Sequence, residues 1–312
     1  MPPPALAPLP TTVDGPRPAV SIVMPTYRRA HHVGASIGSL LRQTFADFEL
    51  IVQDDASPDD TQAVVASTAD ARVRYFRNPR NLRMPANLNA GLRQTRGRFV
   101  LVCHDHDLYE PDLVERMVAV LSADGRIAYV HAGVGVIDEG GTPTGRTYVG
   151  DYPARSDGVQ WARYMVTRFD SPVCANTMVP RSVYEQAGLY DPDFGFVSDV
   201  EMWLRLALAG DVGYIARPLI GVREREPGHE YFSMRWEVTD TMVRMLRLYH
   251  TRAFSGAAGG LRSALFRARV EAHLLRGYLS ALKRRDWADG RRARAYFRRS
   301  PTIVCRAVGY LG

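Results

Sequence analysis

Short runs of apolar residues alternate along the first half of the chain with segments whose apolar residues recur at helical spacing. The apolar runs, typical of buried strands, lie at residues 19–25, 48–53, 73–76, 98–103 and 127–137. Helical spacing occurs between them, at residues 33–41, 61–67, 84–95 and 112–121. Strands that alternate with helices through short loops predict a mostly parallel α/β sheet flanked by helices.

The pattern changes after residue 137. Helical segments are expected at residues 159–167 and, more strongly, at 198–209, with short strands within 214–222. From residue 238 onward the apolar positions predict helices with basic faces. We therefore expect a disordered, proline-rich lead-in at residues 1–18, an α/β domain at 19–237 and a basic helical extension at 238–312.

Composition is that of a soluble globular protein, with 46% hydrophobic and 23% charged residues. No apolar run reaches 18 residues, so no transmembrane helix is expected, and the lead-in lacks the pattern of a secretory signal. Cys103, Cys174 and Cys305 lie far apart, which argues against a disulfide framework or a zinc ribbon. These features favour a cytoplasmic protein, with a peripheral place at the inner face of the membrane as one option.

Charge is distributed unevenly. Residues 241–312 contain 16 basic and 3 acidic residues, a balance of +13, whereas the whole chain carries +7 and the preceding residues therefore −6. Such asymmetry favours an anionic partner for the basic tail, for which membrane lipid, a phosphorylated carrier and nucleic acid are the alternatives.

Polar clusters follow three of the expected strands. They are Thr26-Tyr27-Arg28, Asp54-Asp55 and Asp105-His106-Asp107. In parallel α/β sheets, ligands bind beyond the carboxyl ends of the strands. We therefore expect the three clusters to converge in one cleft.

The Asp105-His106-Asp107 turn has the chemistry of a divalent cation site. Two carboxylates can hold Mg²⁺ together with substrate phosphate oxygens, and a flanking imidazole also tolerates Mn²⁺. Such an ion would stabilise charge on a leaving diphosphate. The alternative is a solvated turn, since Asp-x-Asp is common by chance.

Two further acidic clusters each allow two interpretations. Asp54 and Asp55 could accept hydrogen bonds from a nucleobase or a ribose, or could cap the helix expected near Asp60. Asp199 and Glu201 open a strong helix, where the helix dipole favours carboxylates. A carboxylate there could instead act as general base toward an acceptor hydroxyl.

Four motifs in order resemble family 2 glycosyltransferases of the GT-A fold, over about residues 19–225. They are VSIVMPT at 20–26, LLRQTFADFELIVQDDASPDDT at 40–61, the Asp-x-Asp turn followed by Pro111, and SDVEMWLRLA at 198–207. The resemblance implies inverting transfer of a sugar from a UDP-, GDP- or dTDP-sugar to a hydroxyl acceptor, which could be a glycan, a lipid-linked molecule or a small molecule. It also implies Mn²⁺ or Mg²⁺ on the diphosphate.

The resemblance also implies roles for individual residues. Asp105 and Asp107, with His106 beside them, would form the metal and ribose site, and Asp199 would be the catalytic base. The nucleotide-sugar would be bound by Pro25, Thr26, Tyr27, Asp54, Asp55, Arg83 and Asp105.

The chain departs from the family pattern in three places. Alignment on Pro111 puts His104 and His106 where the family has its metal-site aspartates, so the literal Asp-x-Asp is out of step by one residue. Ala56 replaces the usual glycine after the paired aspartates. The family's Tyr-Arg-x-His element reads Val222-Arg223-Glu224-Arg225 here, and His229, four residues later, is either a displaced ligand or a surface residue.

Other functions remain to be weighed against sugar transfer. Nucleotidyl transfer and dinucleotide-dependent oxidation both need a glycine-rich loop after the first strand, and residues 25–29 contain no glycine. A non-catalytic nucleotide-binding or scaffold module with a degenerate site stays open. In the tail, Leu274, Leu275, Tyr278, Leu279 and Leu282 recur between arginines, which fits packing on the core or an anionic membrane surface. Nucleic acid is not expected, because no reader motif is present.

Overall fold

The computed structural model describes residue 9 and residues 17–168, 171–173, 176–224, 236–254, 261–283 and 285–298. The chain divides into two compact units, residues 1–165 with 171–224, and residues 166–170 with 225–312. The domain boundary expected after residue 237 falls in the first turn of α8 (Trp236–Ala253), in the second unit. Over the described ranges, no helix has the length and apolar character needed to span a bilayer.

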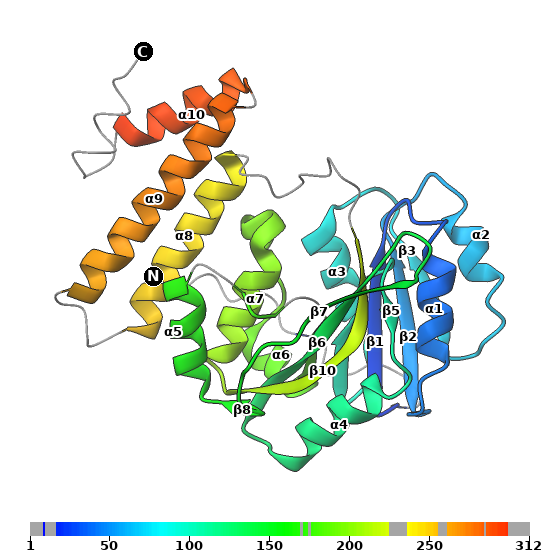
Figure 1. Ribbon diagram of the computed structural model, residues 1–312. Coiled ribbons are helices and arrows are strands. Elements are labelled where there is room, and N and C mark those ends of the chain that lie inside the picture. The colour runs from blue at the N-terminus through cyan, green and yellow to red at the C-terminus, as the bar shows by residue number, and fades with distance from the viewer. Residues whose placement is uncertain are drawn as a thin grey trace. The chain divides into compact units, whose positions relative to one another are not determined.

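Within the described residues, the first unit is built on a ten-stranded sheet with the order β3-β2-β1-β4-β9-β6-β10-β5. Figure 1 shows this sheet with helices on both sides. Its first four strands along this order are mutually parallel, and they are β1 (Val20–Thr26), β2 (Phe48–Asp54), β3 (Val73–Arg77) and β4 (Phe99–Val102). The predicted α/β architecture with a mostly parallel sheet is confirmed.

The second half of the sheet departs from simple alternation. Strands β6 (Ile127–Ile137) and β10 (Asp211–Arg223) are parallel to each other. The short β9 (Met178–Pro180) lies between β4 and β6 and is antiparallel to both. Three further strands pair at the margins: β5 (Leu108–Tyr109) and β8 (Arg155–Ser156) with β10, and β7 (Pro143–Tyr148) with β6. Several short strands were expected at residues 214–222, but these residues belong to the single strand β10, whose pairing with β6 contains register shifts.

The helices of the first unit lie close to their expected positions. They are α1 (Val33–Leu41), α2 (Thr61–Ala66), α3 (Met84–Leu92), α4 (Leu113–Ala123), α5 (Gly158–Arg168) and α7 (Ser198–Ala207). Two described helices were not expected from the sequence, α6 (Arg181–Ala187) and the 3₁₀ helix η1 (Pro192–Val197), and neither were the short strands β5, β7, β8 and β9.

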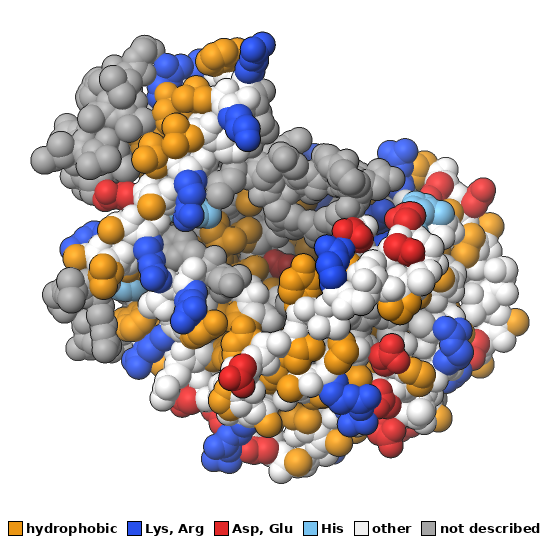
Figure 2. All heavy atoms as spheres, in the orientation of Figure 1, with side chains coloured by type: hydrophobic (Ala, Val, Ile, Leu, Met, Phe, Trp, Pro, Cys, Tyr) orange, Lys and Arg blue, Asp and Glu red, His pale blue; other side chains and the backbone are white. Residues whose placement is uncertain are grey.

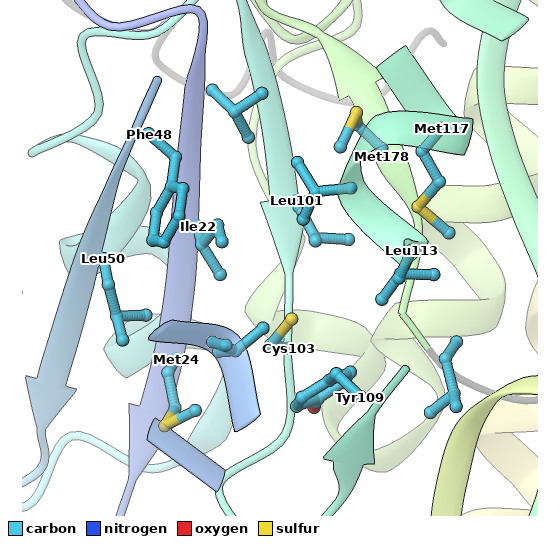
Figure 3. Packing of buried hydrophobic residues seen from close by; sticks show 14 of the residues in the cluster. Ile22, Met24, Phe48, Leu50, Leu101, Cys103, Tyr109, Leu113, Met117 and Met178 are labelled. Carbon is cyan, nitrogen blue, oxygen red and sulfur yellow. The ribbon is translucent and has the colours of Figure 1, made fainter. Parts of the chain in front are cut away.

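Alternate residues of β1 face opposite sides of the sheet and so bury two helical layers. Ile22 and Met24 join a buried cluster to which α1 and α4 also contribute (Figure 3). Val23 faces α3, where Gly91 allows close approach, since a Cβ there would lie 2.7 Å from Val23 Cγ1. Helix α3 therefore packs directly against β1 and β2, the strands that end at two of the polar clusters.

Apart from residues 166–168 at the end of α5, the helices described in the second unit are α8, α9 (Leu261–Lys283) and α10 (Trp287–Arg298). Phe297 is fully buried, with its ring 5.6 Å from that of Trp236 and 5.8 Å from that of Tyr278. Asp289 at the start of α10 accepts a 2.8 Å hydrogen bond from the backbone N–H of Trp236. These contacts give the three helices a core of their own.

His131 is a titratable residue without exposed surface in the core of the first unit. It lies on β6 with its ring 4.8 Å from that of Tyr214 and 5.5 Å from that of Trp161. Among the residues that the structure describes, neither of its ring nitrogens has a hydrogen-bond partner. Burial lowers the pKa of His131 from 6.5 to about 3, so the imidazole is neutral at physiological pH.

We expect His131→Phe to raise the free energy of unfolding at pH 7 by about 1 kcal/mol, because a buried polar group without a partner is removed. In the wild type, the unfolded chain protonates His131 below its ordinary pKa of 6.5, whereas the folded chain does not until about pH 3. Stability is therefore lost as pH falls through this window, by up to about 1.4 kcal/mol per pH unit.

Urea unfolding at several pH values between 7.5 and 5 measures this effect. His131→Gln serves as the control, since it abolishes the titration but keeps a buried polar group; it should flatten the pH dependence without raising stability at pH 7. Parallel stability–pH curves for the wild type and His131→Phe would contradict the assignment.

Candidate functional site

The carboxyl ends of β1, β2 and β4 lie side by side at one edge of the sheet (Figure 1). Thr26 is in register with Asp54, and the N–H of Asp55 donates to the Thr26 carbonyl at 2.9 Å. From the next loop, Arg28 N–H donates to Ser57 Oγ at 3.0 Å. The three polar clusters are therefore brought to one place, as expected from a parallel sheet.

In the Thr26-Tyr27-Arg28 cluster, the hydroxyl group of Thr26 is buried without a hydrogen-bond partner among the described residues. Tyr27 next to it is 40% exposed, and Pro25 is half-buried. A buried hydroxyl without a partner, beside an accessible aromatic ring, suits contact with a polar ligand at this edge.

Asp54 is occupied by protein partners. One carboxylate oxygen accepts from the N–H of Ser57 at 2.9 Å, and the other accepts from the hydroxyl of Tyr75 at 2.5 Å, with Arg77 Nε 3.4 Å away. Burial and the neighbouring Asp54 charge raise the pKa of Tyr75, so this phenol stays a donor. Asp54 thus shapes the loop after β2.

Asp55 holds a second loop. Its Oδ1 accepts from Asn78 Nδ2 at 2.8 Å and from Leu82 N–H at 2.7 Å, and its Oδ2 accepts from Arg83 N–H at 2.8 Å. The Arg83 side chain is exposed, and its backbone has a φ of +69°. Asp55 therefore keeps Arg83 presented at the edge of the sheet. Ala56, which replaces the family's glycine, has a φ of +60°, where glycine is the less strained residue.

The turn after β4 groups two histidines with one aspartate. One ligand atom each from His104, His106 and Asp107 lies within 4.8 Å of the others. The two imidazole rings are stacked, 5.5 Å apart and 7° from parallel. The chain turns at residues 105 and 106, and this turn brings the two histidines together.

Asp107 is the buried anchor of this group. His104 Nδ1 lies 3.0 Å from its Oδ2, and the N–H of Arg223 donates to its Oδ1 at 3.1 Å. Burial disfavours the Asp107 carboxylate, but the bond and charge of His104 prevail and lower the pKa of Asp107. For His104, burial is outweighed by Asp107, Asp105 and Asp199, and its pKa is raised.

Asp105 is not a member of the His104, His106 and Asp107 group, but it contacts His106. Its Oδ1 lies 2.9 Å from His106 Nδ1 and 3.7 Å from Arg29 Nε. A carboxylate bonded to one imidazole nitrogen orients the other nitrogen toward a metal. His106 Nε2 is the nitrogen that approaches Asp107, at 3.8 Å from its Oδ1.

Arg223 was assigned no role from the sequence, yet it joins three segments at this edge. In addition to its N–H bond to Asp107, its Nε donates to the His106 carbonyl at 2.8 Å. Its Nη1 donates to the carbonyls of Asp138, at 2.9 Å, and Glu139. Arg225 and His229 lie outside the described residues.

Asp199 lies in the first turn of α7, half-buried, with Oδ1 accepting from Val200 N–H at 2.7 Å. Its charge is the last of several causes that raise the pKa of His104, after Asp107 and Asp105. Glu201 differs, because it is buried and paired with Arg205 at 2.7 Å. Glu201 therefore stabilises the helix.

The fold is that of GT-A glycosyltransferases, as two solved structures show. The crystal structure of S. aureus TarS 1–349 in complex with UDP-GlcNAc has a TM-score of 0.58 and 16% identity, covering 89% of this chain and 91% of that one. A mannosyltransferase from Pyrobaculum calidifontis in complex with GDP-Man and Mn²⁺ has a TM-score of 0.54 and 18% identity, covering 97% and 80%.

Residues 21–183 match the family described as Glycosyl transferase family 2, and the chain belongs to this family of enzymes. An uncharacterized glycosyltransferase of Rickettsia typhi is 25% identical over 242 residues, 74% of this chain and 69% of that protein. An Escherichia coli UDP-Glc:alpha-D-GlcNAc-diphosphoundecaprenol beta-1,3-glucosyltransferase is 33% identical over 102 residues, 33% of this chain and 40% of that protein. The latter match spans less than half of either protein.

Proposed function

We propose that this enzyme transfers a sugar with inversion from a nucleoside-diphosphate sugar to a hydroxyl acceptor. The observation that carries the proposal is the group formed by His104, His106 and Asp107, at the edge of the sheet that also holds Thr26 and Asp55. The donor-bound structures of the same fold, with UDP-GlcNAc and with GDP-Man, support a nucleotide-sugar that carries UDP or GDP. The family resemblance adds dTDP as a third candidate nucleotide.

Residues His104, His106 and Asp107 fit a divalent ion. One ligand atom from each lies within 4.8 Å of the others, and Asp107 supplies a carboxylate beside the two imidazoles. Two imidazoles suit Mn²⁺ better than Mg²⁺, which prefers oxygen ligands. When bound, the ion would supply Lewis-acid stabilisation of the negative charge on the leaving diphosphate.

In the proposed reaction, the acceptor hydroxyl oxygen attacks the anomeric carbon from the face opposite the diphosphate. The hydroxyl proton passes to the Asp199 carboxylate. The bond between the anomeric carbon and the diphosphate oxygen breaks, and its electron pair leaves with the nucleoside diphosphate. Asp55 contributes by holding the loop that presents Arg83 to the donor.

We expect Asp199→Asn to lower turnover by about 10²- to 10⁴-fold, because the amide cannot accept the proton. Nucleotide affinity should be unchanged. Release of nucleoside diphosphate from UDP-Glc, UDP-GlcNAc and GDP-Man measures turnover, and calorimetry measures affinity.

The matched control for this substitution is Asp193→Asn, which removes an exposed carboxylate six residues earlier. The control should retain wild-type turnover. If Asp199→Asn retained it as well, Asp199 would not be the base.

We further propose that the acceptor is lipid-linked and that the second unit binds an anionic membrane surface. The E. coli relative acts, by its name, on a diphosphoundecaprenol-linked sugar. On α9, Leu265 and Leu279 are 56% and 53% exposed and share a helical face with the exposed Arg276 and Lys283. Figure 2 also shows apolar and basic side chains together on the visible surface of this unit. Exposed leucines among basic residues suit an interfacial helix.

Packing accounts for the other apolar positions of α9. Leu274 and Tyr278 are buried, and Leu275 and Leu282 are half-buried. On α10, Trp287 is 58% exposed. The tail therefore has a packed face and an exposed face, and the membrane proposal concerns the exposed one.

We expect the full chain to bind vesicles that contain phosphatidylglycerol and not vesicles of phosphatidylcholine alone, with affinity falling as salt is raised. Replacing Leu279 and Trp287 by serine should weaken binding by about tenfold or more, because two apolar side chains no longer enter the interface. Tyr148→Ser, at an exposed aromatic of the first unit, is the control. Co-sedimentation in which the double variant equals the wild type would refute a membrane role for this face.

A further inference from the structure

A second group of potential ligands lies outside the turn after β4. His31 and His32 directly precede α1, and Glu139 lies in the turn that follows β6. Glu139 Oε1 is 2.9 Å from His32 Nε2, and the two imidazole rings lie 4.1 Å apart. One ligand atom from each of the three residues lies within 4.8 Å of the others.

Backbone hydrogen bonds fix both halves of this group. The N–H groups of His32 and Val33 donate to the Arg29 carbonyl at 3.0 and 2.9 Å, which sets the turn before α1. On the other side, Gly141 N–H donates to the Asp138 carbonyl at 3.0 Å. Ligands on two fixed turns need little rearrangement to share an ion.

Exposure differs among the three residues in a way that suits an open coordination site. The His32 side chain is 10% exposed, whereas that of Glu139 is 63% exposed and His31 is also exposed. Water can therefore complete the coordination from the solvent side. Two imidazoles and one carboxylate, with a position left open, form a ligand set that Zn²⁺ commonly takes.

The charge around the group is mixed. The guanidinium of Arg223 disfavours a cation nearby, but it is directed at the carbonyls of Asp138, Glu139 and His106. Glu139 supplies the negative charge that faces the imidazole.

We propose that His31, His32 and Glu139 form a second metal site, which takes Zn²⁺ and clips the start of α1 to the turn after β6. The site does not depend on sugar transfer. Arg223 connects this site with the His104, His106 and Asp107 group, because its side chain donates hydrogen bonds to the carbonyls of Glu139 and His106. Zinc bound at this site would thus stabilise the turn after β6, whose carbonyls accept hydrogen bonds from Arg223.

Zinc titration of the metal-free full-length protein, without nucleotide, tests the proposal. Asp107→Asn serves as the background, because it removes the carboxylate from the His104, His106 and Asp107 group. We expect this variant to bind one Zn²⁺ by calorimetry and to unfold at a higher temperature when zinc is present. Adding His31→Ala, a change at an exposed position that leaves the fold intact, should lower zinc affinity at least tenfold.

Two further variants make the test decisive. In the same background, Glu139→Gln should weaken zinc binding as His31→Ala does, whereas Glu110→Gln, at an exposed glutamate that is not a member of the group, should leave it unchanged. Circular dichroism verifies that each variant is folded. The proposal is overturned if the Asp107→Asn protein takes up no zinc, or if its zinc affinity is unaffected by both His31→Ala and Glu139→Gln.

Discussion

The burial of Asp107 is the constraint on which the edge of the sheet depends. A carboxylate removed from water must find hydrogen-bond donors, and Asp107 finds them in His104 and in the N–H of Arg223. The first partner orients an imidazole within the turn after β4, and the second ties that turn to the end of β10. One desolvated charge therefore sets the positions of the groups that could hold an ion.

The same principle divides the acidic residues of this edge into two kinds. Asp54 and Asp55 lie closest to the sheet, and protein donors occupy their oxygens, so they act by fixing loops. Asp199, on a helix, is half-buried, which leaves it the more suitable proton acceptor. A sequence motif rich in aspartate thus contains positioning residues as well as residues that could meet the substrate.

Hydrophobic periodicity was sufficient to predict the strands and helices up to residue 137, except for the two-residue strand β5, because each of the others buries a regular face. It could not predict β9, whose three residues are too few for a pattern, or Arg223, whose role depends on carbonyls of distant turns. Nor could it decide which residues of the turn after β4 point together. In the structure, the turn after β4 places His104 close to His106, whereas the Asp105 carboxylate lies near Arg29.

Nucleotide-dependent stabilisation tests the central claim most directly, namely that the His104, His106 and Asp107 group binds an ion that holds a nucleoside diphosphate. Melting temperatures would be measured with UDP, GDP and dTDP, with Mn²⁺ and after chelation, for the wild type and for Asp107→Asn against its own baseline. We predict that one nucleotide raises the melting temperature of the wild type only when Mn²⁺ is present, and that Asp107→Asn loses this effect. Equal stabilisation after thorough chelation, or in the variant, would contradict the account.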